Sequence, residues 1–221
     1  MQRTSLGQRT SSEGTRLEQA CSHYKDTYEV HLGTLRQRDI LFYVLLAATA
    51  AFSLQATSPD AANSALTEYI ANSVGIKVSK DSRLLDSMLW FLLLGTSTRH
   101  FQLNVQIERQ YDYIHGLESY LNKYYPRSPV FTREGISYLG NYPLFSNWIW
   151  FLYTIAFPFL LLAAITIKIY LQLSATLQPS SIAFDMSCYF LVSISTALYF
   201  IWMHRSWFSS LAVRLRYGDC K

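Results

Sequence analysis

Two side chains near the middle of the chain have the types and spacing that could act on a phosphate group. Arg109 and His115 are separated by five residues, in the sequence RQYDYIH. An arginine can stabilise negative charge on a phosphate, and a histidine can transfer a proton near neutral pH. The pair also fits the solvent-exposed face of a helix. We favour this second interpretation, because so short a spacing often arises by chance.

Two acidic residues and a proline near apolar stretches could instead take part in ion conduction. Asp86 and Asp185 lie at the starts of two apolar stretches, and in an oligomer they could form an acidic ring that favours cations. Alternatively, each marks the end of a membrane span. Pro158 lies inside an apolar stretch, where the loss of one helix hydrogen bond predicts a kink. Such a kink could serve gating or be a static bend.

Sequence patterns for a cofactor, a metal or a common catalytic site are missing. The chain contains no P-loop, GxSxG, HExxH or Rossmann glycine pattern. Its three cysteines, Cys21, Cys188 and Cys220, have neither CxxC pairing nor metal-ligand spacing. We therefore expect no enzyme activity, no cofactor and no metal.

The composition indicates that these residues belong to a membrane protein. Of 221 residues, 50% are hydrophobic and only 15% are charged, whereas soluble domains average about 25% charged residues. The net charge of +4 is too small to predict a basic face for nucleic acid. We expect an all-α, multi-pass membrane protein whose first partner is the lipid bilayer.

Four apolar stretches predict four transmembrane helices, at residues 40–56, 84–101, 148–168 and 186–203. The second contains Asp86 and Arg99, which must sit near the interfaces. We assign it as a span because three spans would put the basic segments on opposite sides. The other three carry no ionisable residue within the bilayer except tyrosines and Cys188. That composition argues against a proton-coupled transporter.

The distribution of basic residues predicts the orientation in the membrane. With four spans, fifteen Lys and Arg residues lie on one face, against Lys77, Lys80 and Arg83 on the other. Because cytoplasmic segments carry the excess of Lys and Arg, we expect both termini in the cytoplasm.

Amphipathic helices are predicted to extend from the spans into the cytoplasm. Residues 17–39 and 102–125 carry apolar side chains at three- and four-residue steps. We expect these helices to pack together as a bundle, although the stripes could also bind another copy or a soluble protein. The stripe after the second span consists of Leu103, Ile107, Tyr111, Ile114, Leu117 and Leu121. Residues expected at the membrane interface are Arg99, Arg205, Trp207, Arg214, Arg216, Trp148 and Trp150.

Five connecting or terminal segments complete the predicted organisation. Residues 1–16 are expected to form a flexible cytoplasmic tail, and 57–83 an extracytoplasmic loop with a short helix near 60–72. Residues 126–147 are expected to form a cytoplasmic or interfacial loop and 169–185 a short extracytoplasmic loop. The basic amphipathic tail, 204–221, could lie on the membrane surface.

The layout resembles that of small bacterial four-transmembrane-helix proteins of the anti-phage effector type. The resemblance rests on helices that extend into a cytoplasmic bundle and on residues 100–165, which include ERQYDYIHGLESYL. It carries over no functional residue. It implies an oligomeric inner-membrane effector or scaffold of a defence system, whose cytoplasmic helices bind a soluble partner or signal. Within that function, a pore and a passive anchor are both open.

Two other functions are considered. One is a small ion channel or transporter unrelated to defence. The other is a membrane-anchored ribonuclease, because R-x4-6-H pairs resemble the catalytic motif of HEPN ribonucleases. In that motif, the resemblance assigns phosphate binding to Arg109 and proton transfer to His115.

Overall fold

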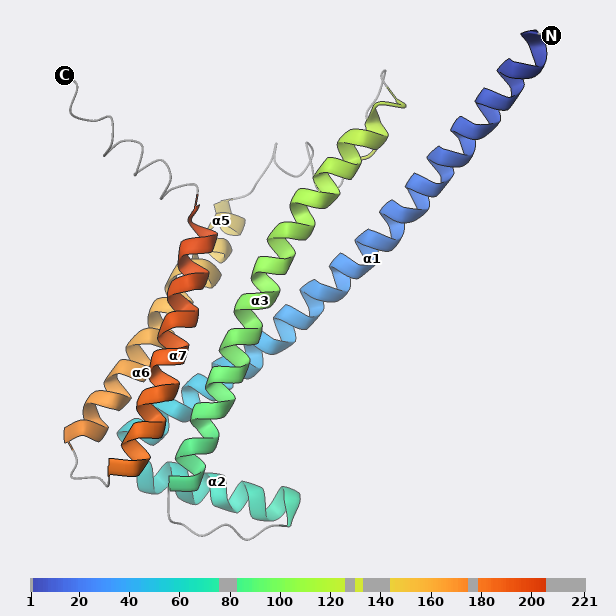
Figure 1. Cartoon of the computed structure of the whole chain (residues 1–221). Helices are drawn as coiled ribbons and strands as arrows, with labels where there is room; N and C mark the ends of the chain where they lie inside the picture. The colour runs from blue at the N-terminus through green and yellow to red at the C-terminus, as the bar shows by residue number, and fades with distance from the viewer. Residues whose placement is uncertain (1, 76–82, 126–129, 133–143, 175–178, 206–221) are drawn as a thin grey trace, which may run out of the picture. The chain divides into compact units, whose positions relative to one another are not determined.

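The computed structural model describes residues 2–75, 83–125, 130–132, 144–174 and 179–205, which are helical over most of their length (Figure 1). Within these ranges no strand occurs, so the predicted all-α class is confirmed. The elements are α1 (Gln2–Thr57), α2 (Pro59–Val74), α3 (Arg83–Asn122), α5 (Leu144–Phe151), η1 (Leu152–Ala156), α6 (Phe157–Ser174) and α7 (Pro179–Met203).

Three helical stretches in the described chain are long and apolar enough to cross a membrane. They are Gly14–Thr57, Trp148–Ser174 and Ile182–Met203. They agree with three of the four predicted spans. The remaining one, 84–101, is helical within α3, but Asp86, Arg99 and His100 lower its mean hydropathy.

The chain divides into two compact units, and α1 and α3 contribute to both. Unit 1 consists of Met1–Arg38 and Gln106–Asn147, and unit 2 of Asp39–Val105 and Trp148–Lys221. In both helices the division separates a polar half from a more apolar half.

Unit 1 is an antiparallel pair of helices. Side chains early in α1 meet side chains late in α3, and later residues of α1 meet earlier ones of α3. Thus Tyr24 contacts Glu118, whereas Thr34 contacts Gln110. The apolar steps predicted over 17–39 and 102–125 lie in these helices. The two halves therefore pack against each other.

Unit 2 is a helical bundle around one apolar core. Its buried residues come from α1, α3, α6 and α7, and the closest approach is between α6 and α7. At the centre, the ring of Phe52 meets that of Trp90 edge-on, with the ring centroids 4.7 Å apart. The largest fully buried side chains of this core are those of Leu45, Phe52, Trp90, Leu93, Leu161, Ile165 and Val192.

The predicted kink at Pro158 coincides with a local change of helix type. Proline lacks the amide that would complete a helical hydrogen bond. Immediately before it, η1 is a π-helix, in which the amide of Phe157 donates to the carbonyl of Leu152. The helix therefore widens by one residue per turn here, and such π-bulges often occur at functional positions.

Several predicted boundaries differ from those observed. The residues expected to form a flexible tail, 1–16, belong to α1 from Gln2 onward. The loop expected over 169–185 is shorter, because α6 continues to Ser174 and α7 begins at Pro179. Apolar and polar residues at helical spacing continue past the span ends, so hydropathy alone placed the ends too early.

The helix predicted near 60–72 is confirmed as α2. It begins at Pro59, whose fixed φ suits a first helical turn, and it ends at Gly75. Gly75 has φ 74°, a left-handed conformation that glycine adopts at little cost. In Figure 1, α2 runs crosswise to the other helices of unit 2.

Candidate functional site

The most unusual feature of unit 2 is a buried lysine near the end of α6. Only 3% of the Lys168 surface is exposed, and its ammonium forms an ion pair with Asp86 of α3. It also donates a hydrogen bond to Oε1 of Gln55 in α1, at 2.8 Å. The ammonium nitrogen lies 4.8 Å from the centroid of the Phe52 ring. A carboxylate, an amide oxygen and an aromatic ring thus surround the buried ammonium group, and each of them attracts a cation.

A glutamine one turn further along α6 connects the two acidic residues. The amide nitrogen of Gln172 donates to Oδ2 of Asp86 at 2.8 Å and to Oδ2 of Asp185 at 3.0 Å. On the other side, Nε2 of Gln55 donates to Oδ1 of Asn63 in α2, at 3.2 Å. We call this set the Lys168 network. Its members are Gln55, Asn63, Asp86, Lys168, Gln172 and Asp185.

The helices place these groups together through simple spacing. Lys168 and Gln172 are four residues apart and so lie on one face of α6. Asp86 lies in the first turn of α3, and Asp185 lies early in α7. Each helix therefore contributes a polar residue at the same end of the apolar core, and the network ties five helices together.

The energetics of the network depend on complete pairing. Burying a charge away from water is costly unless it is paired and hydrogen-bonded. Here one ammonium faces two carboxylates, and amide groups provide the remaining hydrogen bonds. This arrangement can fix the helices in one register, because any slip would leave a buried charge without its partner.

The network corrects the predicted environment of the spans. The sequence places Lys168, Asp86 and Asp185 at span ends and treats the spans as almost free of ionisable groups. In the structure, α6 and α7 continue beyond these residues, and the three side chains meet within a single chain. The acidic ring proposed for an oligomer needs Asp86 and Asp185 from several copies, whereas one copy already brings them together through Gln172.

A second polar group lies elsewhere in unit 2. His100 is fully buried, and Asn104 bonds both its Nε2, at 3.1 Å, and the hydroxyl of Tyr199, at 3.3 Å. The ring of Phe42 lies 5.3 Å from that of His100. By contrast, the neighbouring Arg99 is exposed, as expected for a residue at an interface. Asn104 lies one turn from His100 on α3, whereas Tyr199 and Phe42 come from α7 and α1.

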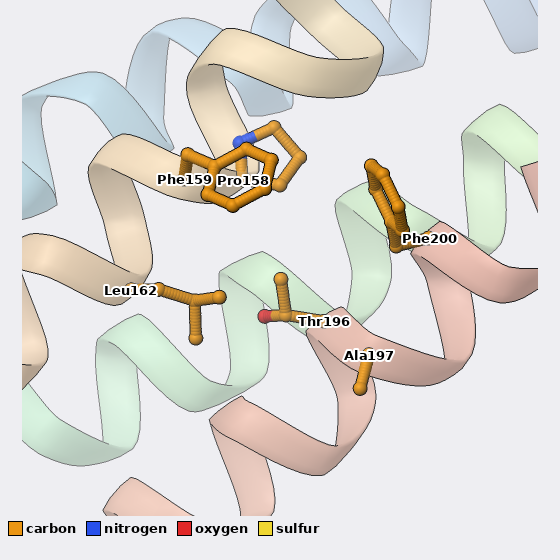
Figure 2. Close-up of a pocket in the computed structure, with 6 residues that line it drawn as sticks. All are labelled: Pro158, Phe159, Leu162, Thr196, Ala197 and Phe200. Atoms are coloured by element: carbon orange, nitrogen blue, oxygen red, sulfur yellow. The ribbon is translucent and has the colours of Figure 1, made fainter.

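An apolar groove of about 130 Å³ runs between α6 and α7, next to the π-helix (Figure 2). Its single polar side chain, Thr196, donates its hydroxyl hydrogen to the carbonyl of Val192. The groove therefore offers no free polar group for a substrate. Its lining residues are Pro158, Phe159, Leu162, Thr196, Ala197 and Phe200. Pro158 is buried and forms one wall of this groove.

Polar layers also lie between the two helices of unit 1. The hydroxyl of Tyr24 donates to Oε1 of Glu118 at 2.9 Å, and Glu118 is only 2% exposed. Nδ1 of the buried His31 lies 3.1 Å from Oε1 of Gln110. His31 precedes the apolar stretch that starts at Ile40. Burial lowers the pKa of its imidazole, and the positive charge of Arg38 acts in the same direction, against the hydrogen bond that the imidazole donates to Gln110.

The structure does not bring the candidate catalytic pair together. Arg109 and His115 are both exposed on α3. Six residues along an α-helix place them about 120° apart around its axis and about 9 Å apart along it. This geometry agrees with a solvated helical face, the interpretation favoured from the sequence.

Most of the stripe proposed to bind a partner is buried within the chain. Leu103, Ile107, Ile114 and Leu121 are each less than 5% exposed, while Tyr111 and Leu117 are partly buried. A soluble partner could reach these side chains only after displacing the helices that cover them. The burial therefore favours packing within the chain for this face.

The expected interface residues are found partly within the described ranges. Trp148 and Trp150 are about half exposed, and the Trp150 ring lies edge-on to His204, at 5.5 Å. The guanidinium of Arg205 lies over the ring of Trp202, at 4.6 Å. These contacts place aromatic and cationic groups together at one end of α7. Trp207, Arg214 and Arg216 lie outside the described residues.

Comparison with protein-family models, curated proteins and solved structures finds no match. The function must therefore be inferred from the geometry of the chain.

Proposed function

We propose that the chain is a four-span membrane scaffold that holds a two-helix arm, unit 1, in the cytoplasm of a bacterial cell. In the defence setting implied by the resemblance, the arm receives a soluble partner or signal. The observation that carries the proposal is the antiparallel pairing within unit 1. The proposal rests on that pairing and on the continuity of the chain.

The antiparallel pairing within unit 1 supports an even number of membrane crossings between its two helices. The polar half of α1 packs against the polar half of α3, for example through Tyr24 and Glu118. These halves therefore share one side of the membrane. If the chain leaves that side through the apolar stretch 40–56, it must return before Gln106. Two described helices lie in between, and α2, with 16 residues that include Asp60 and Glu68, is too short and polar. The return therefore falls to the first part of α3.

The ion pair with Lys168 supports the same return crossing. Asp86 is one of the charges that make the second span unfavourable, and Lys168 compensates it within the bundle. On the outer face of this stretch, Met88, Phe91 and Leu92 are between 44% and 61% exposed. Large apolar side chains at that level of exposure suit contact with lipid rather than water.

The packing of unit 2 favours an anchor over a pore within one chain. Large side chains at its centre, including Trp90, Phe52 and Leu161, are fully buried. Among the described helices, these groups fill the space through which ions would have to pass. A conducting path would therefore have to form between copies.

A combined infection and voltage assay tests the proposal. Cells carrying the gene with its native neighbours would be challenged with phage, and their membrane potential would be followed with a fluorescent dye. The proposal predicts that deletion of the gene abolishes protection and that the intact chain does not itself depolarise cells. Unchanged protection after deletion would contradict the defence setting, and depolarisation that requires unit 2 would contradict the passive anchor.

A further inference from the structure

One carboxylate of the Lys168 network lacks a compensating charge. The network holds two acidic residues, Asp86 and Asp185, but only one lysine. Asp86 forms the ion pair with Lys168. Asp185 is 6% exposed, and the only hydrogen bond to it among the described residues comes from the neutral amide of Gln172, at 3.0 Å, to its Oδ2.

We propose that the Lys168 network binds one proton, carried by Oδ1 of Asp185. If both carboxylates were ionised, the network would have a net charge of −1 in a largely apolar environment, where an uncompensated charge is strongly unfavourable. The two acidic residues also share the amide group of Gln172, which places like charges close together. A single proton removes both penalties.

The surrounding groups leave Asp185 as the preferred site. The charged groups that act on it are Asp86 from α3 and Lys168 from α6, and the nearest titratable neighbour on its own helix is Cys188. From α1 and α2, the network receives only the neutral amides of Gln55 and Asn63. Because the ammonium of Lys168 pairs directly with Asp86, Asp185 is the carboxyl that carries the proton.

This inference differs from the sequence-based expectation that the spans lack proton-binding groups. It is also independent of the proposed scaffold function, because the charge balance concerns unit 2 alone. Loss of the proton would leave two carboxylates around Gln172. Gln172 of α6 links α7 to α3 at this end through its bonds to Asp185 and Asp86, so the proton should help to keep α7 in place.

Infrared spectroscopy on the full chain in lipid nanodiscs at neutral pH tests the proposal. A protonated carboxyl has its own C=O stretching band, which shifts in heavy water. Relative to the natural sequence, Asp185→Asn should remove the intensity of one carboxyl. Asp86→Asn should also remove one, because Lys168 would then pair with Asp185. Lys168→Met should add one, since both carboxylates would need a proton.

Matched controls make the result specific. Asp60→Asn, at an exposed position in α2, should leave the band unchanged, and Glu118→Gln accounts for any signal from the buried carboxyl of unit 1. If Lys168→Met does not fold, as judged by circular dichroism, the two aspartate variants still decide the question. The proposal is wrong if Asp185→Asn leaves the band intact. The proposal is equally wrong if the natural sequence lacks the band of a protonated carboxyl and sodium ions, rather than a proton, stabilise the chain.

Discussion

Units 1 and 2 are built in part from the same two helices, yet they use polar residues in opposite ways. In unit 1, α1 and α3 carry exposed charges, such as Lys25 and Glu29 with 77% and 65% of their side chains accessible. A few polar pairs lie between the helices. In unit 2, the core is apolar and the buried charges are gathered in the Lys168 network. Loss of a polar contact should therefore change the free energy of unfolding little on the surface of unit 1 and greatly inside unit 2.

The largest expected effect is that of removing Lys168. Lys168→Met would leave Asp86 and Gln55 without their partner, and breaking a buried ion pair typically costs roughly 3–5 kcal/mol. We expect a loss of that size in the free energy of unfolding, measured in lipid or detergent. The matched control is Lys25→Met in unit 1, whose pair with Glu29 spans 4.0 Å at the surface. Equal losses for both variants would contradict the contrast between the units.

Core truncations in the two units should also differ. Ile114 in unit 1 and Ile165 in unit 2 are both fully buried. In water, Ile114→Ala should cost roughly 2–5 kcal/mol, from lost transfer energy and a cavity. Ile165→Ala should cost less, because lipid tails are as apolar as the core, so only packing is lost. Unfolding measurements that give the larger loss for Ile165→Ala would argue that unit 2 is not surrounded by lipid.

A single hydrogen bond in unit 1 should have a smaller effect. Tyr24→Phe removes one donor from the buried carboxylate of Glu118, which should lower stability by about 1–3 kcal/mol. Tyr120→Phe is the control, because its hydroxyl meets that of Tyr124 at an exposed position. Equal free energies of unfolding for Tyr24→Phe and Tyr120→Phe in chemical denaturation would contradict this prediction.

His31 predicts a pH dependence within unit 1. The pKa of His31 is lower in the folded chain than in the unfolded chain. Below about pH 6.5, the ordinary pKa of histidine, the unfolded chain therefore binds more protons than the folded chain. The free energy of unfolding should thus fall as the pH drops below that value. Thermal unfolding across this range should show the effect in the natural sequence and a flatter profile for His31→Asn. The exposed His115 provides the control, since His115→Asn should leave the profile unchanged.

The smallest effects are expected at the candidate catalytic pair. Arg109→Ala and His115→Ala change exposed side chains, so each should alter stability by no more than about 0.5 kcal/mol. RNA cleavage assays on the purified chain should give no difference between these variants and the natural sequence. Cleavage that disappears in both variants would restore the ribonuclease hypothesis.

The sequence predicts the helices better than it predicts the site. Regular apolar spacing identifies the helices over 17–39 in α1 and 102–125 in α3, and long apolar stretches identify α6 and α7. The sequence also identifies Pro158 as a point of irregularity, although the π-helix beside it could not be foreseen. Helix ends are less certain, since polar residues such as Lys168 are consistent both with a span end and with a buried pair.

The Lys168 network could not be assembled from the sequence because its members come from five helices. One signal was available: Lys168 and Gln172 share a face of α6 and are followed closely by Asp185. Asp86 is far away in the chain, and only the packing of α3 against α6 reveals it as the partner. The same holds for His100, whose link to Tyr199 through Asn104 depends on how α7 packs.

Cysteine accessibility tests most directly whether the chain crosses the membrane and returns between the two halves of unit 1. Single cysteines at the exposed positions Ser22, Ser64 and Ser119 would be introduced into a variant without the natural cysteines. They would be treated with a membrane-impermeant maleimide, first in intact cells and then in inverted vesicles. We expect Ser22→Cys and Ser119→Cys to react only in vesicles and Ser64→Cys only in cells. Reaction of positions 22 and 119 from opposite sides would contradict the account.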